Sequence, residues 1–163
     1  MNTISSQLVD EVTGLLQASV TDVFSTMLRM EVLPVDPEEI RKGDEVFVAA
    51  SVGFVGDVHG IVYMYLKASF ARALAGRLLS LEESELTEDE IIDDTIGELS
   101  NMVVGAIKSR LCNEGIACTL TIPSIIRGRG LNVQPVGSSE AEQLTMVCDN
   151  ELIMLELIMK PSP

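Results

Sequence analysis

The chain has 163 residues, and its net charge of −14 disfavours nucleic acids and anionic membranes as partners. Apolar residues make up 47% of the sequence, which suits one folded domain over 1–163. We find neither an apolar run of the ~20 residues that a membrane span needs nor a secretory signal. The 3 cysteines lack CxxC spacing, so we expect reduced, buried thiols in a cytoplasmic protein.

The first predicted element is a helix, which Ser5 or Ser6 caps and which ends before Pro34. Its apolar residues recur at roughly helical spacing. They are Leu8, Val12, Leu15, Leu16, Val20, Val23, Phe24 and Met27. The segment is therefore expected to bury one face against the rest of the molecule.

A hairpin and a short helix follow. The segments 46–52 and 58–66 are rich in β-branched residues, which favours strands. The glycines between them, Gly53 and Gly56, predict the turn of the hairpin. The apolar spacing over about 69–79 predicts a short helix.

The next predicted element is a second long helix over 88–112. Thr87 and Glu90 have the spacing of a capping box at its start. Acidic residues near that end favour the helix through its macrodipole. The turn-forming residues 113–115 predict its end.

The rest of the chain is predicted to be strands over 116–122, 131–136, 143–148 and 152–159, with Asp149-Asn150 as a hairpin turn. Helices and strands do not alternate strictly, so we predict an α+β fold with a mainly antiparallel sheet and two long helices packed on it. Each half begins with a long helix and continues into strands, which suggests a degenerate internal duplication.

The second long helix separates apolar from polar residues. Its predicted core face consists of Ile92, Ile96, Leu99, Val103, Ala106 and Ile107. On the opposite side lies a polar stripe made of Asp94, Glu98, Asn101, Gly105 and Lys108. Gly105 presents no side chain, so a partner can approach the helix closely there.

Such a stripe has an ordinary interpretation, because charged residues opposite an apolar face usually form a solvated surface. Against it, Gly97 and Gly105 inside the helix each cost about 1 kcal/mol relative to Ala, although close packing can also explain a glycine. A Glu accepts hydrogen bonds and pairs with cations, whereas an Asn amide both donates and accepts. The pair suits positioning of a water molecule in phosphoryl transfer rather than proton transfer.

The segment Asp94-Thr95-Ile96-Gly97-Glu98-Leu99-Ser100-Asn101-Met102 resembles the signature of the CheC/CheX/FliY family of chemotaxis phosphatases. That signature has Asp or Ser, three residues, Glu, two residues, Asn and, a little over twenty residues later, a Pro, for which Pro123 is suitably placed. Gly105 also fits the family, and the closest subtype is CheX.

The resemblance implies a CheC-like fold and hydrolysis of the aspartyl phosphate on a CheY-type receiver. It implies that Asn101 orients the attacking water and that Glu98 contacts the receiver's active-site Lys, with Asp94, Gly105 and Pro123 in supporting positions. The Mg²⁺ belongs to the receiver, so no cofactor or metal of the chain's own is expected. CheX proteins are homodimers with one motif per chain, and here the first helix has Ser19-Val20-Thr21-Asp22 where CheC-type members carry a second motif.

One alternative function remains open. The chain could be a non-catalytic module that binds or sequesters a receiver in a two-component pathway. The apolar strand 152–159 would leave an exposed edge, which also favours a homodimer.

The lone His59 is interpreted as structural, and Arg127 or Arg129 as turn residues that can touch an acidic partner.

Overall fold

The computed structural model describes residues 5–36, 45–130 and 140–161. Its helices and strands, in chain order, are α1 (Ser6–Val23) with the π-helical turn η1 (Phe24–Leu28), β1 (Leu33–Pro34), β2 (Phe47–Gly56), β3 (Val58–Lys67), α2 (Ala68–Leu79), the 3₁₀ turn η3 (Glu83–Glu85), α3 (Asp89–Asn113), β4 (Cys118–Leu120), β5 (Ser124–Gly128), β6 (Glu140–Cys148) and β7 (Glu151–Pro161). The predicted α+β class is confirmed.

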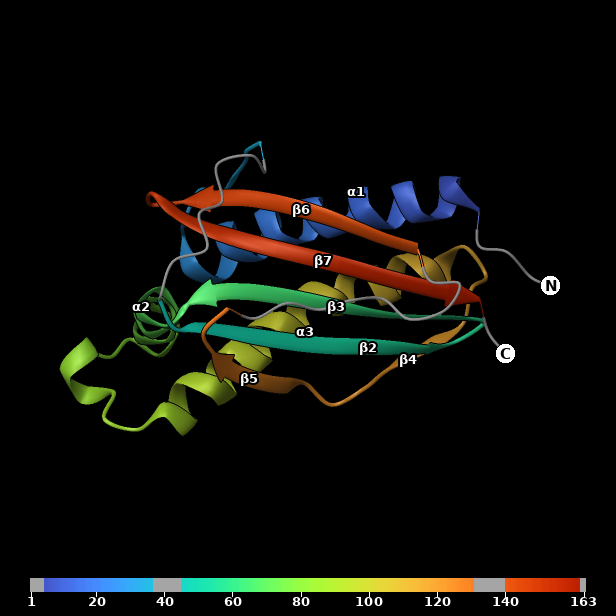
Figure 1. The fold of residues 1–163 in the computed structure, drawn as a ribbon. Coiled ribbons are helices and arrows are strands. Elements are labelled where there is room, and N and C mark those ends of the chain that lie inside the picture. Colours follow the sequence, from blue (N-terminus) through green and yellow to red (C-terminus); the bar gives the residue numbers. More distant parts are fainter. Residues whose placement is uncertain (1–4, 37–44, 131–139, 162–163) are drawn as a thin grey trace.

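All seven strands belong to one antiparallel sheet, with the order β1-β6-β7-β3-β2-β4 and with β5 paired to β2 beside β4. The two long hairpins, β2–β3 and β6–β7, form its centre. Asp149 and Asn150 close the second hairpin with φ of 50° and 63°, as the sequence predicts. Figure 1 shows the sheet in front of α1 and α3, which pack on one face of it.

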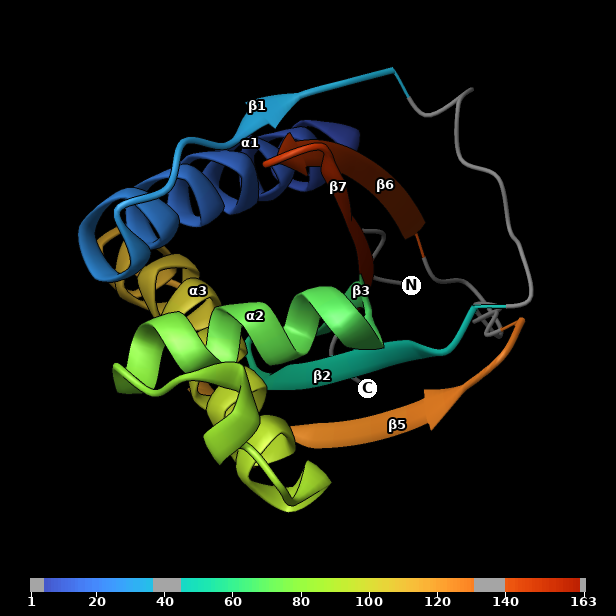
Figure 2. The same ribbon diagram turned by 90° about the vertical axis from the view of Figure 1, so that its left-hand side faces the viewer.

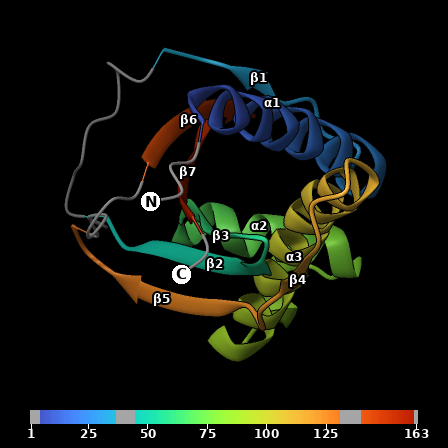
Figure 3. The ribbon, with the colours of Figure 1, turned by 90° about the vertical axis from the view of Figure 1, so that its right-hand side faces the viewer.

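The helices and the sheet enclose one apolar core. Side views show α1 next to β6 and β7, and α3 next to β2 and β4 (Figures 2 and 3). The largest fully buried side chains include Phe24, Phe54 and Leu99. Ser5 caps α1 as predicted, because its Oγ accepts a hydrogen bond of 3.1 Å from the Leu8 N–H. None of the helices in the described ranges is long and apolar enough to cross a membrane.

The topology supports the internal duplication. One half runs α1, β1, β2, β3, and the other runs α3, β4–β5, β6, β7. The short strand of each half pairs with the hairpin of the other half, since β1 pairs with β6 while β4 and β5 pair with β2. The pairing of β3 with β7 joins the halves at the centre of the sheet.

Several predictions about the strands are wrong. Gly53 lies inside β2 rather than in the turn, whereas Gly56 is the last residue of β2 and adjoins the turn at Asp57. Gly56 is needed for close approach, because an added Cβ would overlap the backbone of Ala117. Strand β5 was not predicted, and the strand predicted over 131–136 lies outside the described residues.

The predicted open edge is also wrong. Strand β7 pairs with β3 on one side and with β6 on the other, so it lies in the interior of the sheet. Strand β7 therefore offers no open edge that would favour a homodimer, and its apolar character reflects its central position in the sheet.

The capping box predicted at Thr87 and Glu90 is absent. Helix α3 has Glu88 at its N-cap, without a side-chain cap hydrogen bond. The reciprocal capping interaction occurs instead between Glu82 and Glu85, which open η3. The acidic residues expected at the start of α3 are present, as Asp89 and Glu90. The capping pair belongs to η3, the short element before this helix.

The cysteines differ in exposure. Cys118 and Cys148 are buried, as predicted, and burial raises the pKa of both thiols, that of Cys148 to about 11. Cys112 is exposed near the end of α3, so the prediction of a buried thiol is wrong there.

Candidate functional site

The polar stripe predicted on α3 faces away from the core. Asp94 and Glu98 are exposed, while Asn101, Gly105 and Lys108 are half-buried. The prediction that Asp94, Glu98 and Asn101 are accessible is confirmed. Glu98 and Asn101 are three residues apart on a continuous helix, so their Cα atoms differ by about 4.5 Å along its axis.

The polar groups of this stripe are available to a partner. Within the described part of the chain, the side chains of Asp94, Glu98 and Asn101 have no hydrogen bond or ion pair. A Cβ added to Gly105 would meet no atom within 4 Å, so the notch that the sequence predicts is open. A carboxylate and an amide thus stand free beside a bare stretch of helix.

Contacts from other elements hold α3 in place. The Arg127 guanidinium of β5 donates to Asp93 Oδ1 from Nε at 2.9 Å and from Nη2 at 2.6 Å. On another side of the helix, the buried Ser19 hydroxyl of α1 donates to the Val103 carbonyl at 2.7 Å. These contacts fix the helix while its outward side stays free, which suits a site that works by positioning.

Pro123 packs against α3 at Gly97. A Cβ built on Gly97 would lie 3.4 Å from the Pro123 Cβ, which is van der Waals contact, so the proline packs directly on this part of the helix. Gly97 is buried and directly precedes Glu98. At about 100° per residue, Gly97 lies about 40° around the helix from Asn101, so Pro123 packs at the border of the polar stripe on the side of Asn101.

Some details of the helix wheel are wrong. Ala106 was assigned to the core face but is exposed, whereas Thr95, Ser100 and Val104 are buried. The buried face of α3 is thus wider than predicted and includes the polar side chains of Thr95 and Ser100. Arg127 was considered for a partner surface, but it is engaged with Asp93, and no spacing along the chain indicated that pair.

Helix α1 carries a related but different outward face. Ser19 of α1 contacts Val103 of α3, and the two residues are 84 positions apart. We therefore align the two helices with an offset of 84 residues. In this alignment Asp10, Gly14, Gln17 and Thr21 correspond to Asp94, Glu98, Asn101 and Gly105. The comparable place for a second motif is therefore Gly14 to Gln17 rather than Ser19 to Asp22. Neither Glu nor Asn is present there either, so the expectation of one motif in this chain stands.

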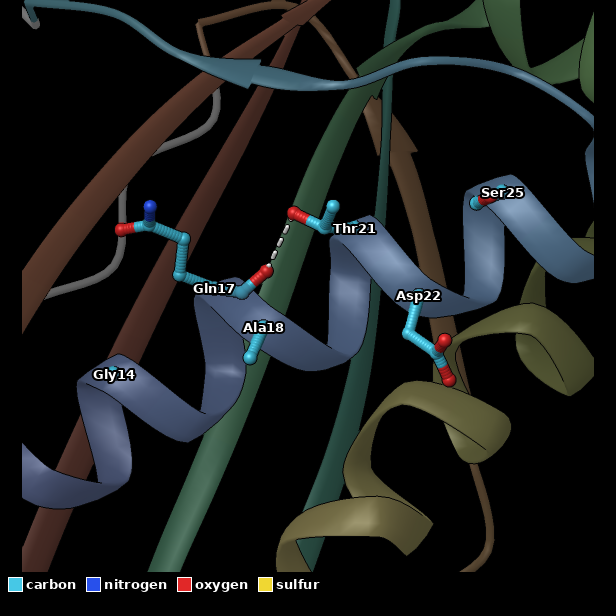
Figure 4. Close-up of a pocket in the computed structure, with 6 residues that line it drawn as sticks. All are labelled: Gly14, Gln17, Ala18, Thr21, Asp22 and Ser25. Atoms are coloured by element: carbon cyan, nitrogen blue, oxygen red, sulfur yellow. Dashed lines mark hydrogen bonds between the residues drawn. The ribbon is translucent and has the colours of Figure 1, made fainter.

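A shallow hollow of about 530 Å³ lies on this outward face. The residues that line it, drawn in Figure 4, are Gly14, Gln17, Ala18, Thr21, Asp22 and Ser25. The Thr21 hydroxyl donates to the Gln17 carbonyl of its own helix at 3.0 Å. The hollow has no carboxylate at the position of Glu98, so it lacks half of the α3 pair.

The sequence profile described as chemotaxis phosphatase CheX matches residues 48–146, which is more than half of the chain and includes all of α3. The chain belongs to the CheX family of chemotaxis phosphatases. The family match thus agrees with the resemblance found in the motif around Glu98 and Asn101.

Individual CheX proteins are similar to this chain at low identity. The CheY-P phosphatase CheX of Thermotoga maritima is 26% identical over 87 residues, which are 53% of this chain and 55% of that protein. The alignment thus spans about half the length of that curated relative. The CheX structure from Desulfovibrio desulfuricans has a TM-score of 0.76 at 23% identity and covers 92% of this chain and 99% of its own.

A further structure with the same fold is the CheX-CheY-BeF3-Mg²⁺ complex from Borrelia burgdorferi. It has a TM-score of 0.74 at 21% identity and covers 91% of this chain and 97% of its own. Among the described residues of our chain, no three His, Cys, Asp or Glu side chains are grouped so that they could hold a metal ion.

Proposed function

We propose that this chain is a phosphatase that accelerates hydrolysis of the aspartyl phosphate on a phosphorylated CheY-type receiver and so terminates a chemotaxis signal. A water oxygen attacks the phosphorus atom while the bond from phosphorus to the aspartyl oxygen breaks. The products are inorganic phosphate and the free Asp carboxylate of the receiver. The chain supplies positioning, which is the main lever on the barrier of phosphoryl transfer.

The observation that carries the proposal is the free pair Glu98 and Asn101 on the outward side of α3, in a chain of the CheX family. The Asn101 amide orients the water in line with the phosphorus atom, because it can donate and accept hydrogen bonds at once. Glu98 pairs with the receiver's active-site Lys, which aligns the two proteins. The open notch at Gly105 lets the receiver's loops approach the helix closely.

The metal of the reaction belongs to the receiver in this proposal. The related Borrelia CheX was solved as a complex with CheY, BeF3 and Mg²⁺. We therefore propose that the receiver brings its Mg²⁺ and that this chain needs no cofactor of its own.

A binding module without catalysis is the rival function. The discriminating experiment is single-turnover loss of phosphate from purified CheY-type receivers that carry phosphate from a small-molecule donor, with and without this protein. We expect faster loss with the wild type and near-intrinsic loss with Asn101→Ala. Binding without acceleration by the wild type, measured on BeF3-loaded receivers, would establish the rival instead.

The assembly and location are part of the proposal. We propose a cytoplasmic homodimer, on the basis of the family alone, since the edge-strand argument fails. A monomeric mass in multi-angle light scattering at 10-fold and 100-fold higher concentration than the assay would contradict the dimer. The charge of −14 makes nucleic acids poor partners, whose binding would show as a salt-sensitive mobility shift.

A further inference from the structure

Ile122 is an exposed apolar side chain between β4 and β5. It is 86% exposed, compared with 53% for Leu33 and Ile126, the next most exposed large apolar residues of the described chain. Single exposed apolar residues are common on proteins and need no explanation by themselves. The setting of Ile122 is what makes it informative.

The backbone on both sides of Ile122 is fixed to strand β2. The Thr121 N–H donates to the Gly53 carbonyl at 2.8 Å, and the Gly53 N–H donates to the Thr121 hydroxyl at 2.8 Å. On the other side, Ser124 of β5 pairs with Ser51 of β2. Ile122 is thus presented by a short bridge between two paired segments, and little chain entropy remains to be lost on binding.

The same bridge touches the candidate site. Pro123, the neighbour of Ile122, packs against α3 at Gly97, and Gly97 directly precedes Glu98. The proline ring also restricts the backbone of the preceding residue, which is Ile122. Gly97 lies only about 40° around the helix from Asn101, so a partner that engages Asn101 on α3 meets this bridge at the border of the polar stripe.

We propose that Ile122 is a docking residue that packs against an apolar patch beside the phosphorylation pocket of the receiver. The inference rests on the proposed function and adds a division of labour to it. Asn101 aligns the attacking water and Glu98 contributes to both alignment and binding, whereas a preorganised apolar side chain that becomes buried contributes to affinity alone. Its contact is the same before and during hydrolysis, so it strengthens receiver binding without changing the chemical step.

The test compares Ile122→Ala with Ile126→Ala. Ile126 is a matched control, because it is also an exposed isoleucine, four residues later, but its β5 position pairs with Ala49 on the sheet face opposite the helices. We expect Ile122→Ala to weaken binding to the BeF3-loaded receiver and to raise KM about tenfold, with kcat within about twofold of wild type. Ile126→Ala should change neither quantity, and Ile122→Leu should restore most of the affinity.

Three results would overturn the inference. Equal binding by Ile122→Ala and Ile126→Ala would show that Ile122 does not dock the receiver. A fall in kcat at unchanged KM would assign it to the chemical step, and a loss of dimer mass in light scattering would assign it to self-association. A failure of the proposed function itself is distinguishable, because then the wild type would neither bind any receiver nor speed its dephosphorylation.

Discussion

Helices α1 and α3 bury residues at equivalent positions, but the residues on their outward faces differ in chemistry. The buried residues of α1 are Val9, Val12, Leu16, Ser19, Val20 and Val23. The residues 84 positions later on α3 are Asp93, Ile96, Ser100, Val103, Val104 and Ile107. All of these α3 residues are buried except Asp93, which is half-buried. The outward positions do not keep this likeness. The two helices therefore share a pattern of buried positions, while the residues on their outward faces differ.

The difference between the faces is concentrated at three positions. Glu98, Asn101 and Gly105 of α3 correspond to Gly14, Gln17 and Thr21 of α1. On α1 the carboxylate is missing, the amide is on a longer side chain, and a side chain fills the position of the notch. A longer amide has one more rotatable bond, so it holds a water less rigidly than Asn does. The comparison teaches that the fold alone does not make the site.

The largest expected effect separates the two amides. Asn101→Ala should slow receiver dephosphorylation by about 100-fold, because loss of the amide removes the in-line orientation of the water. The residue is half-buried on the outward side, so the fold should remain intact. Gln17→Ala on α1 is the matched control and should leave the rate unchanged in the same single-turnover assay. Near-normal activity of Asn101→Ala would refute its role.

The next effect concerns the carboxylate that α1 lacks. Glu98→Gln removes a charge-assisted contact with the receiver's Lys, so both receiver binding and turnover should fall by about tenfold. Calorimetry on the BeF3-loaded receiver and single-turnover kinetics measure the two separately. Glu90→Gln changes the net charge of the chain equally at another exposed position of α3, and it should have little effect. Equal losses in both variants would indicate general electrostatics rather than a specific pair.

A smaller effect contrasts the two exposed glycines. Gly105→Ala and Gly14→Ala should each stabilise the protein by roughly 0.5–1 kcal/mol in urea unfolding, because neither added Cβ meets an atom within 4 Å and Ala favours helix. Only Gly105→Ala should lose activity, by several-fold, since it fills the notch beside Asn101. If both variants kept full activity, the notch would have no part in docking.

The smallest effect is expected at the two aspartates that begin the outward stripes. Asp94→Ser should reduce turnover by less than about threefold, because the family signature also accepts Ser at this position. Asp10→Ser on α1 should have no effect. A loss with Asp94→Ser as large as that with Glu98→Gln would place Asp94 in direct contact with the receiver.

Much of the fold could be predicted because the signals were local. The cap at Ser5, both hairpins and the extent of α3 depend on residues close in sequence, and all were predicted to within a few positions. The predicted open edge at 152–159 failed because strand order is set by pairing between distant segments. The predicted turn at Gly53 failed because that glycine accommodates Thr121, which is 68 positions away.

The sequence by itself determined the spacing of Glu98 and Asn101, since the helical repeat places residues three and four apart on one face. It also indicated the family, through the motif residues Glu98 and Asn101, whose side chains make no hydrogen bond or ion pair with other described residues. Only the tertiary structure decided that Arg127 donates hydrogen bonds to Asp93, that Pro123 packs against Gly97 and that Ile122 is exposed near the site. These depend on contacts between distant segments, which hydrophobic periodicity along the chain does not encode.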